Sequence, residues 1–286
     1  MTPAARELAV TYLYVPADRP ERVAKAFTLG ADVVIMDLED AVAPEAKVAA
    51  RSALPALVSA RGEQRVQVRV NAVDTEYAAA DLATVAGLDT DIEVRLPKVE
   101  SPQTIDEVRR LLGGERPIHA LVETAIGIEQ AFDIARYGPP LASIGLGEAD
   151  LRSALGVSDD RALEWARGRI VVAAAAAGLP APAQSPYLNV RDLVGLSESS
   201  QTGRSHGFVG RCAIHPAQLA PIRAAYRPVT EEVVRAQATL DRLAHGAVDV
   251  LDDGSFIDPA MVGAARRVLD LERLTREPGT RSGSAS

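Results

Sequence analysis

The sequence predicts an α/β fold, a (β/α)8 barrel of the TIM type followed by a C-terminal helical lid extension. Its 286 residues fit one barrel of roughly 250 residues and an appendage. Short apolar runs alternate with helical patterns over about the first 225 residues, which indicates parallel strands joined by crossover helices. Polar residues follow the apolar part of almost every strand. A closed barrel would gather these strand ends at one mouth, whereas an open doubly wound sheet, the main alternative, would spread them along an edge.

Eight short runs are candidate strands because each is apolar and ends near a polar residue. They are Tyr12–Ala17, Val33–Asp37, Val66–Asn71, Ile92–Lys98, Ile118–Glu123, Leu141–Gly147, a weak run near Tyr187, and Cys212–His215. Helical patterns separate them at Pro20–Leu29, Pro44–Ser59, Glu76–Val85, Ser101–Leu112, Ile128–Tyr137 and Arg161–Ala177. Ser101 and Pro102 are typical of a helix start, and Gly178 is typical of a helix end.

The pattern changes after Pro228, so we expect a barrel domain over residues 1–228 and a lid over residues 229–275. The lid should contain a helix from Thr230 to about His245, a turn at Asp252–Gly254 and a last helix from Pro259 to about Leu274. Residues 276–286 are polar and rich in Gly and Ser, which predicts a disordered tail.

The composition excludes several functional classes. A net charge of −8 gives no general attraction to nucleic acid or to an anionic membrane, so neither is expected as a partner. The single cysteine, Cys212, excludes an intramolecular disulfide and a metal site made of several cysteines. Residues 1–7 lack the apolar core of a signal peptide, and no apolar stretch is long enough to cross a membrane. These features predict a cytoplasmic enzyme.

Carboxylates are concentrated at the ends of three predicted strands. Asp37, Glu39 and Asp40 close the second strand, where three acids would repel one another unless a cation lay beside them. Glu123 ends the fifth strand and Asp150 follows the sixth, so a barrel would make them neighbours. Mg²⁺ takes one or two such carboxylates and completes its octahedron with water and substrate. In the structural alternative, the first three acids form a solvated strand end, Asp150 caps a turn and Glu123 forms an ion pair.

Cationic side chains lie near the same strand ends. Arg69 would bring a planar guanidinium suited to a carboxylate or a developing enolate oxygen, with a plain ion pair as the alternative. Lys98 is either a Schiff-base lysine or a partner of Glu123, and the surrounding acids should keep it protonated. Arg19 and Lys25 lie in the first βα turn and its helix, where they form either an anion site or a solvated face.

Seven stretches occur in order along nearly the whole chain: Tyr14–Arg22, Met36–Val42, Arg69–Asn71, Leu96–Glu100, Glu123–Ala125, Gly147–Leu151 and Ile214–Gln218. Each stretch alone is weak, but the ordered set resembles the citrate lyase β-subunit-like family of CoA-ester lyases, within the wider HpcH/HpaI aldolase group. The resemblance implies that Glu123 and Asp150 ligate Mg²⁺, that Glu39 and Asp40 hold its waters, and that Arg69 binds the thioester carbonyl or the keto-acid oxygens.

The resemblance also implies contacts away from the metal. Arg19 and Lys25 would meet the CoA phosphates. Gly254–Asp258 is similar to a lid motif whose aspartate enters a neighbouring subunit's site, which nominates Asp258 and implies a homotrimer or a homohexamer.

Two further residues have no assigned role. Many relatives carry a glutamate directly before the metal-binding aspartate, where this chain has Ala149 and the acid Glu148 one place earlier. His215 is as readily structural as functional.

The implied reaction is the retro-Claisen cleavage of a 3-hydroxyacyl-CoA thioester of the malyl-CoA or citramalyl-CoA type, giving acetyl-CoA or another acyl-CoA and a 2-oxo acid. Arg69 would stabilise the enolate, and Asp258 would protonate its carbon. The alternatives are a citrate lyase β subunit acting on a citryl carrier-protein thioester together with partner subunits, and a metal-dependent aldolase for free hydroxy-oxo acids. A non-catalytic barrel is disfavoured because clustered buried charge does not benefit a scaffold.

Overall fold

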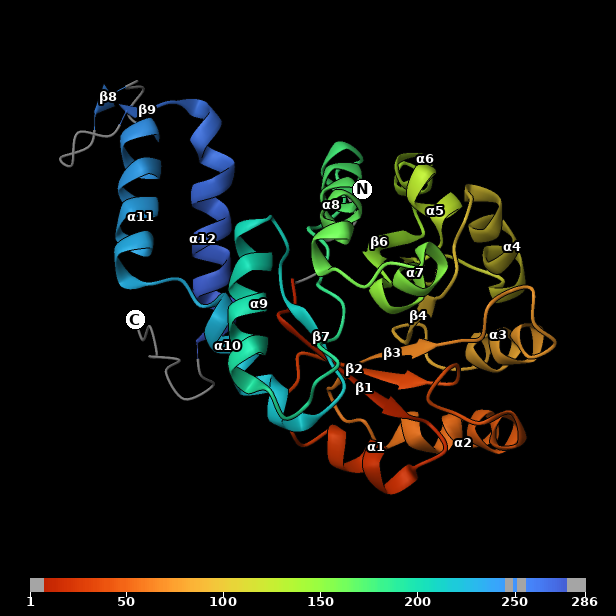
Figure 1. The fold of residues 1–286 in the computed structure, drawn as a ribbon. Helices are drawn as coiled ribbons and strands as arrows, with labels where there is room; N and C mark the ends of the chain where they lie inside the picture. The colour runs from red at the N-terminus through yellow and green to blue at the C-terminus, as the bar shows by residue number, and fades with distance from the viewer. Residues whose placement is uncertain (1–7, 245–248, 251–255, 277–286) are drawn as a thin grey trace. The chain divides into compact units, whose positions relative to one another are not determined.

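The computed structural model describes residues 8–244, 249–250 and 256–276 (Figure 1). The chain divides into two compact units, Met1–Ile222 and Arg223–Ser286. Each unit is described by itself.

The first unit is built around a curled sheet of seven parallel strands (Figure 1). In spatial order the strands run β6-β5-β4-β3-β2-β1-β7, so each of the first six pairs with its neighbour in sequence and β7 returns to pair with β1. The strands are β1 (Thr11–Pro16), β2 (Val33–Asp37), β3 (Arg65–Arg69), β4 (Glu93–Leu96), β5 (Ile118–Val122), β6 (Leu141–Leu146) and β7 (Arg211–Ala213). Seven of the eight predicted strands are confirmed to within a few residues.

The predicted closed barrel of eight strands is confirmed only in part. Where an eighth strand was expected near Tyr187, the chain forms an isolated parallel bridge between Gln184 and Arg211, and β6 and β7 remain the edges of the described sheet. The physical reason lies in the sequence around Gln184, where Pro180, Pro182 and Pro186 remove backbone donors that a regular strand needs.

Helices follow most strands of the first unit. They are α1 (Pro20–Ala26), α2 (Lys47–Ser59), α3 (Ala78–Ala86), α4 (Pro102–Leu112), α5 (Ala125–Glu129), α6 (Ala131–Ala135), α7 (Glu148–Leu155), α8 (Glu164–Ala176), α9 (Leu193–Ser205) and α10 (Leu219–Tyr226), which crosses the unit boundary, with 3-10 turns at Pro44–Ala46, Asp160–Leu163 and Pro216–Gln218. The single helix predicted over Ile128–Tyr137 is instead α5 and α6, divided at Gln130. Helices α7, α9 and α10 were not predicted.

Helix α4 illustrates how local sequence sets an element. Pro102 begins it, and Ile105 and Val108 are buried at helical spacing. Gly113 ends it with a φ of 68°, a conformation that favours glycine. Ser101 lies at the predicted N-cap position, but its side chain makes no capping hydrogen bond.

The second unit contains α11 (Thr230–Ala244) and α12 (Val262–Thr275), which pack against each other. Between them, β8 (Asp249–Val250) pairs antiparallel with β9 (Phe256–Ile257), and a 3-10 turn spans Pro259–Met261. The predicted turn at Asp252–Gly254 and most of the predicted tail lie outside the described residues. Among the described residues, no helix is both long and apolar enough to span a membrane.

Candidate active site

A cavity of about 1010 Å³ lies within the first unit and is lined by strands and by the loops at their carboxyl ends. Six of the polar residues singled out in the sequence line it: Asp37, Asp40, Arg69, Glu123, Glu148 and Asp150. The parallel sheet therefore brings together side chains that are far apart in sequence, which agrees with the expectation that the strand ends meet at one place.

Asp37 and Arg69 form the buried centre of this site. They lie opposite each other in the register of β2 and β3. Arg69 donates from Nε to Asp37 Oδ1 at 2.8 Å and from Nη2 to Asp37 Oδ2 at 2.6 Å, which is a bidentate ion pair. Burial lowers the pKa of Arg69, but Asp37 outweighs this effect and the pKa is raised overall. The guanidinium is thus a fixed cation, oriented by Asp37, an acid that the sequence placed in the cluster after the second strand but to which it gave no separate role.

The third nitrogen of Arg69, Nη1, faces the two predicted acids. It donates to Asp40 Oδ2 at 3.1 Å and lies 2.9 Å from Glu39 Oε2. The second contact is close enough for an ion pair but lacks hydrogen-bond geometry, so Glu39 Oε2 is a buried oxygen without a donor among the described residues. Burial raises the pKa of Glu39, Arg69 opposes this shift and Asp40 adds to it. A buried carboxylate oxygen that still needs a donor suits a metal-bound water.

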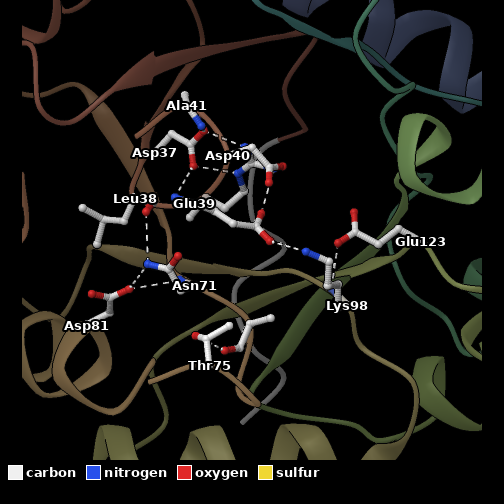
Figure 2. Close-up of polar contacts among 12 residues, drawn as sticks. Asp37, Leu38, Glu39, Asp40, Ala41, Asn71, Thr75, Asp81, Lys98 and Glu123 are labelled. Carbon is white, nitrogen blue, oxygen red and sulfur yellow. Dashed lines mark hydrogen bonds and ion pairs between the residues drawn. The ribbon is translucent and has the colours of Figure 1, made fainter. Parts of the chain in front are cut away.

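Lys98 connects Glu39 to Glu123 (Figure 2). Its Nζ donates to Glu39 Oε1 at 3.0 Å, and its backbone N–H donates to Glu123 Oε1 at 2.9 Å. The φ of Lys98 is 51°, a left-handed conformation that is uncommon outside glycine and often occurs at functional sites. Burial lowers the pKa of Lys98, but Glu39 outweighs it and the pKa is raised overall. A protonated Lys98 agrees with the prediction and disfavours a Schiff-base role, which needs the free amine.

A buried polar network holds the loop that carries Glu39. Lys47 Nζ donates to the carbonyl oxygens of Leu38 and Glu39 and to Asn71 Oδ1, each at 2.7 Å. Asn71 Nδ2 in turn donates to the Leu38 carbonyl at 3.0 Å and to Asp81 Oδ2 at 2.6 Å (Figure 2). This network fixes the backbone after β2, and Lys47 and Asp81 gave no motif by which the sequence could have nominated them.

Glu123 follows β5 and Asp150 lies in α7, and both line the same cavity. Glu123 is 3% exposed, and a Cβ at Gly147 would overlap its carboxylate, so glycine is required at the start of α7. Burial raises the pKa of Glu123 to about 7, and the charges of Glu39 and Asp150 add to the shift. Carboxylates that disfavour one another's ionisation fit a divalent cation.

The protein side chains of this site do not by themselves provide all the ligands that a metal ion needs. No group of three His, Cys, Asp or Glu side chains in the described part of the chain is arranged to hold a metal ion. Two carboxylates, Glu123 and Asp150, match the way Mg²⁺ binds proteins, because Mg²⁺ retains several waters and takes further oxygens from its substrate.

Glu148 does not add to this set. It forms a bidentate ion pair with Arg167, whose Nε donates to Oε1 at 3.0 Å and whose Nη2 donates to Oε2 at 2.6 Å. Its charge is therefore matched, and Asp150 remains the available acid of α7.

Three of the residues considered in the sequence analysis lie away from the cavity or serve local structure. Arg19 and Lys25 are exposed and do not line the cavity, and Arg19 Nε lies 3.6 Å from Asp18 Oδ2. Their contact with CoA phosphates stays a prediction. His215 caps the 3-10 turn at Pro216–Gln218, because its Nδ1 accepts from the Ala217 N–H at 3.2 Å.

Asp258 belongs to the second unit. Its Oδ1 accepts from the Ala260 N–H at 2.7 Å, which caps the 3-10 turn before α12. Its catalytic role also stays a prediction.

The raised pKa of Glu123 predicts a pH-dependent stability of the metal-free protein. The folded chain binds more protons than the unfolded chain between pH 4.5, the ordinary pKa, and about 7, so the free energy of unfolding should fall as pH rises through this window. Thermal denaturation in EDTA should show this fall, and Glu123→Gln should flatten it. An unchanged slope in the variant would show that Glu123 is not the titrating group.

The HpcH/HpaI aldolase/citrate lyase family matches residues 11–216. A citrate lyase subunit beta-like protein of Mycobacterium tuberculosis is 37% identical, covering 90% of this chain and 93% of its own. A (3S)-malyl-CoA thioesterase of Cereibacter sphaeroides is 34% identical over 90% of this chain and 92% of its own.

Among solved structures, the protein CitE from Mycobacterium tuberculosis, crystallised in complex with magnesium, acetoacetate and coenzyme A, superposes with a TM-score of 0.80. It is 34% identical, and the match covers 93% of this chain and 98% of that one. The match agrees with the family expected from the sequence motifs. The chain is an enzyme that belongs to the HpcH/HpaI aldolase/citrate lyase family.

Proposed function

We propose that this protein is a Mg²⁺-dependent carbon–carbon lyase that cleaves a 3-hydroxyacyl-CoA thioester of the malyl-CoA or citramalyl-CoA type to acetyl-CoA, or another acyl-CoA, and a 2-oxo acid. The observation that carries the proposal is the juxtaposition of Glu123, Asp150 and the fixed cation Arg69 on one cavity. The magnesium, acetoacetate and coenzyme A of the CitE complex supply the matching chemistry in a relative.

Glu123 and Asp150 would hold the metal, with Glu39 and Asp40 accepting hydrogen bonds from its waters. When bound, Mg²⁺ supplies Lewis-acid polarisation of the substrate's oxygens. The raised pKa of Glu123 supports this assignment, because a nearby divalent cation would favour the ionised form that burial, Glu39 and Asp150 disfavour.

Arg69 is the residue of this chain best placed to stabilise the enolate. Asp37 occupies its Nε and Nη2, so the guanidinium is oriented before the substrate arrives and loses little freedom on binding. Its Nη1 donates to Asp40 in the structure, and this hydrogen bond would be replaced by one to the enolate oxygen as negative charge develops there. Asp258 would then protonate the enolate carbon, or remove that proton in the condensing direction.

Four further assignments complete the proposal. Residues 184–185 occupy the position of the missing barrel strand: Gln184 is bonded to β7, and the Ser185 hydroxyl accepts from Glu148 N, which follows β6. Arg19 and Lys25 contact the CoA phosphates. The enzyme is a cytoplasmic homotrimer or homohexamer. Residues 229–275 are its lid, and Asp258 reaches the site of a neighbouring subunit.

The experiment that tests the function is release of 2-oxo acid from malyl-, methylmalyl-, citramalyl- and citryl-CoA, each with Mg²⁺ and with EDTA. We expect cleavage of one ester, abolished by EDTA and restored by excess Mg²⁺. Cleavage of a citryl carrier-protein thioester alone would instead identify a citrate lyase β subunit. Cleavage of free hydroxy-oxo acids alone would identify an aldolase, and metal-independent cleavage would contradict the proposal.

A further inference from the structure

Helix α7, which carries Asp150, is only weakly anchored by apolar packing. All eight of its residues are described, and Leu151 alone is buried. Its N-cap, Gly147, offers no side chain to the free N–H groups of the first turn. A helix of about two turns is marginal by itself, because most helical stability in proteins comes from burial of an apolar face. Polar contacts must therefore help to hold α7 in place.

The side chain of Asp150 has no partner that orients it. Its carboxylate lines the cavity and forms no hydrogen bond or ion pair with the residues that the structure describes. The place of this carboxylate therefore depends on the backbone of α7. Because a ligand must be held within about 0.5 Å of its productive geometry, the contacts that fix α7 also decide how well Asp150 can meet a cation.

A network of four charged side chains ties α7 to α8. Arg167 of α8 donates from Nε and Nη2 to the two oxygens of Glu148, at 3.0 and 2.6 Å. Its Nη1 also donates to Asp160 Oδ2 at 2.7 Å. Arg152 completes the network, because its Nη2 donates to Asp160 Oδ1 at 2.8 Å. Helix α7 is thus held at two positions one turn apart, Glu148 and Arg152.

Helix α8 is a firm support for this network. It packs against β6 and α6, and its buried residues are Ala166, Ile170, Ala173 and Ala174. The side chains of Arg167 and Glu148 are 17% and 16% exposed, so solvent and salt screen this pair less than a surface pair. The bidentate geometry adds directional precision to the charge.

The network also leaves Asp150 unobstructed. Glu148 and Arg152 are four residues apart and therefore share one side of α7. Asp150 lies two residues from each of them, so helical geometry directs it from the opposite side. The charges that hold the helix are matched among themselves, and the carboxylate of Asp150 stays available to a ligand.

We propose that Arg167 is a positioning residue for the metal site: by holding Glu148 and Asp160, it fixes α7 so that Asp150 meets the cation together with Glu123. The inference rests on the proposed function, in which Asp150 is a Mg²⁺ ligand. Positioning and simple electrostatics have opposite consequences here. Arg167 lines the same cavity, so removal of its positive charge alone would strengthen Mg²⁺ binding, whereas loss of its hold on α7 would weaken it.

The test is calorimetric titration of Mg²⁺ into the metal-free protein, with the melting temperature in EDTA as the check that each variant is folded. Arg167→Met removes the charge and keeps an unbranched side chain, and Arg167→Lys keeps the charge without the planar fork. Asp160→Asn weakens the network at its exposed end, where the Asp160 side chain is 67% exposed. Arg161→Met is the matched control, because Arg161 lies in the same 3-10 turn as Asp160 and its side chain is 82% exposed.

We expect Arg167→Met to weaken Mg²⁺ binding by about tenfold or more, the usual result of removing a group that orients a metal ligand. Arg167→Lys should remain weakened, Asp160→Asn should show a smaller loss, and Arg161→Met should match wild type. The sign of the change in Arg167→Met is decisive, because the variant has lost a cation from the cavity that binds the metal.

Unchanged or tighter Mg²⁺ binding by folded Arg167→Met, or full recovery in Arg167→Lys, would overturn the inference and leave the proposed function intact. If Arg167→Met did not fold, Asp160→Asn would decide, and wild-type affinity in that variant would equally overturn the inference. A wild-type protein that bound no Mg²⁺ would overturn the proposed function, and this inference with it.

Discussion

Replacing Glu123 with glutamine should lower kcat/KM for the cleaved thioester by about 10³-fold or more. The substitution keeps the size of the side chain and removes the charge that a divalent cation requires, and metal ions contribute several kcal/mol to transition-state stabilisation in such sites. Steady-state kinetics at saturating Mg²⁺, with calorimetric Mg²⁺ titration, would measure both consequences. We expect metal affinity and turnover to fall together.

The same substitution should not destabilise the metal-free protein. Burial and two neighbouring carboxylates already disfavour the ionised form of Glu123, whose pKa is raised to about 7. Above that pH, loss of the charge removes a repulsion, so the melting temperature in EDTA should be unchanged or higher. The exposed Glu100→Gln is the matched control and should leave kinetics and stability unchanged. Unfolding of Glu123→Gln, or retained metal affinity, would contradict the assignment of Glu123 as a ligand.

The strand pattern predicted which side chains meet at the cavity, but it did not predict which partners their charges have. Apolar runs ending in Asp37, Glu123 and Gly147 placed the strand ends correctly to within one residue, because strands buried on both faces of a parallel sheet are nearly continuous apolar runs. Pairing of charges depends on register, which sequence does not specify. The Asp37–Arg69 ion pair follows from the pairing of β2 with β3, and the Glu148–Arg167 pair joins segments nineteen residues apart.

Arg95 is the converse case, because the sequence could not predict that a charged residue has no carboxylate partner. In sequence it is a charged residue within an apolar run, and nothing distinguishes it from Arg65 or Arg69 on the preceding strand. Only the structure reveals that Arg65 is matched by Glu93 and Arg69 by Asp37, while Arg95 has no carboxylate among the described residues. The barrel prediction is confirmed only in part, and here the reason is local, because the prolines around Gln184 replace the expected strand by a single bridge.

Replacing Asp258 should separate its two possible roles. Asp258 caps the 3-10 turn before α12 by accepting from the Ala260 N–H, and asparagine caps equally well. An acid–base role requires the ionisable carboxylate, whose loss typically lowers the rate by about 10²- to 10⁴-fold. We therefore expect Asp258→Asn and Asp258→Ala both to lose turnover by that factor while calorimetric Mg²⁺ affinity stays at the wild-type value.

Stability provides the contrasting measurement for Asp258. Only Asp258→Ala removes the cap, so it alone should lower the free energy of unfolding, by about 1 kcal/mol. If Asp258→Asn were as active as wild type and Asp258→Ala were impaired, capping would explain the residue and the proton donor would have to be sought elsewhere. If both variants turned over normally, Asp258 would have no role in the mechanism. A purely structural role cannot explain loss of turnover in both variants, because Asp258→Asn keeps the cap that Asp258→Ala removes.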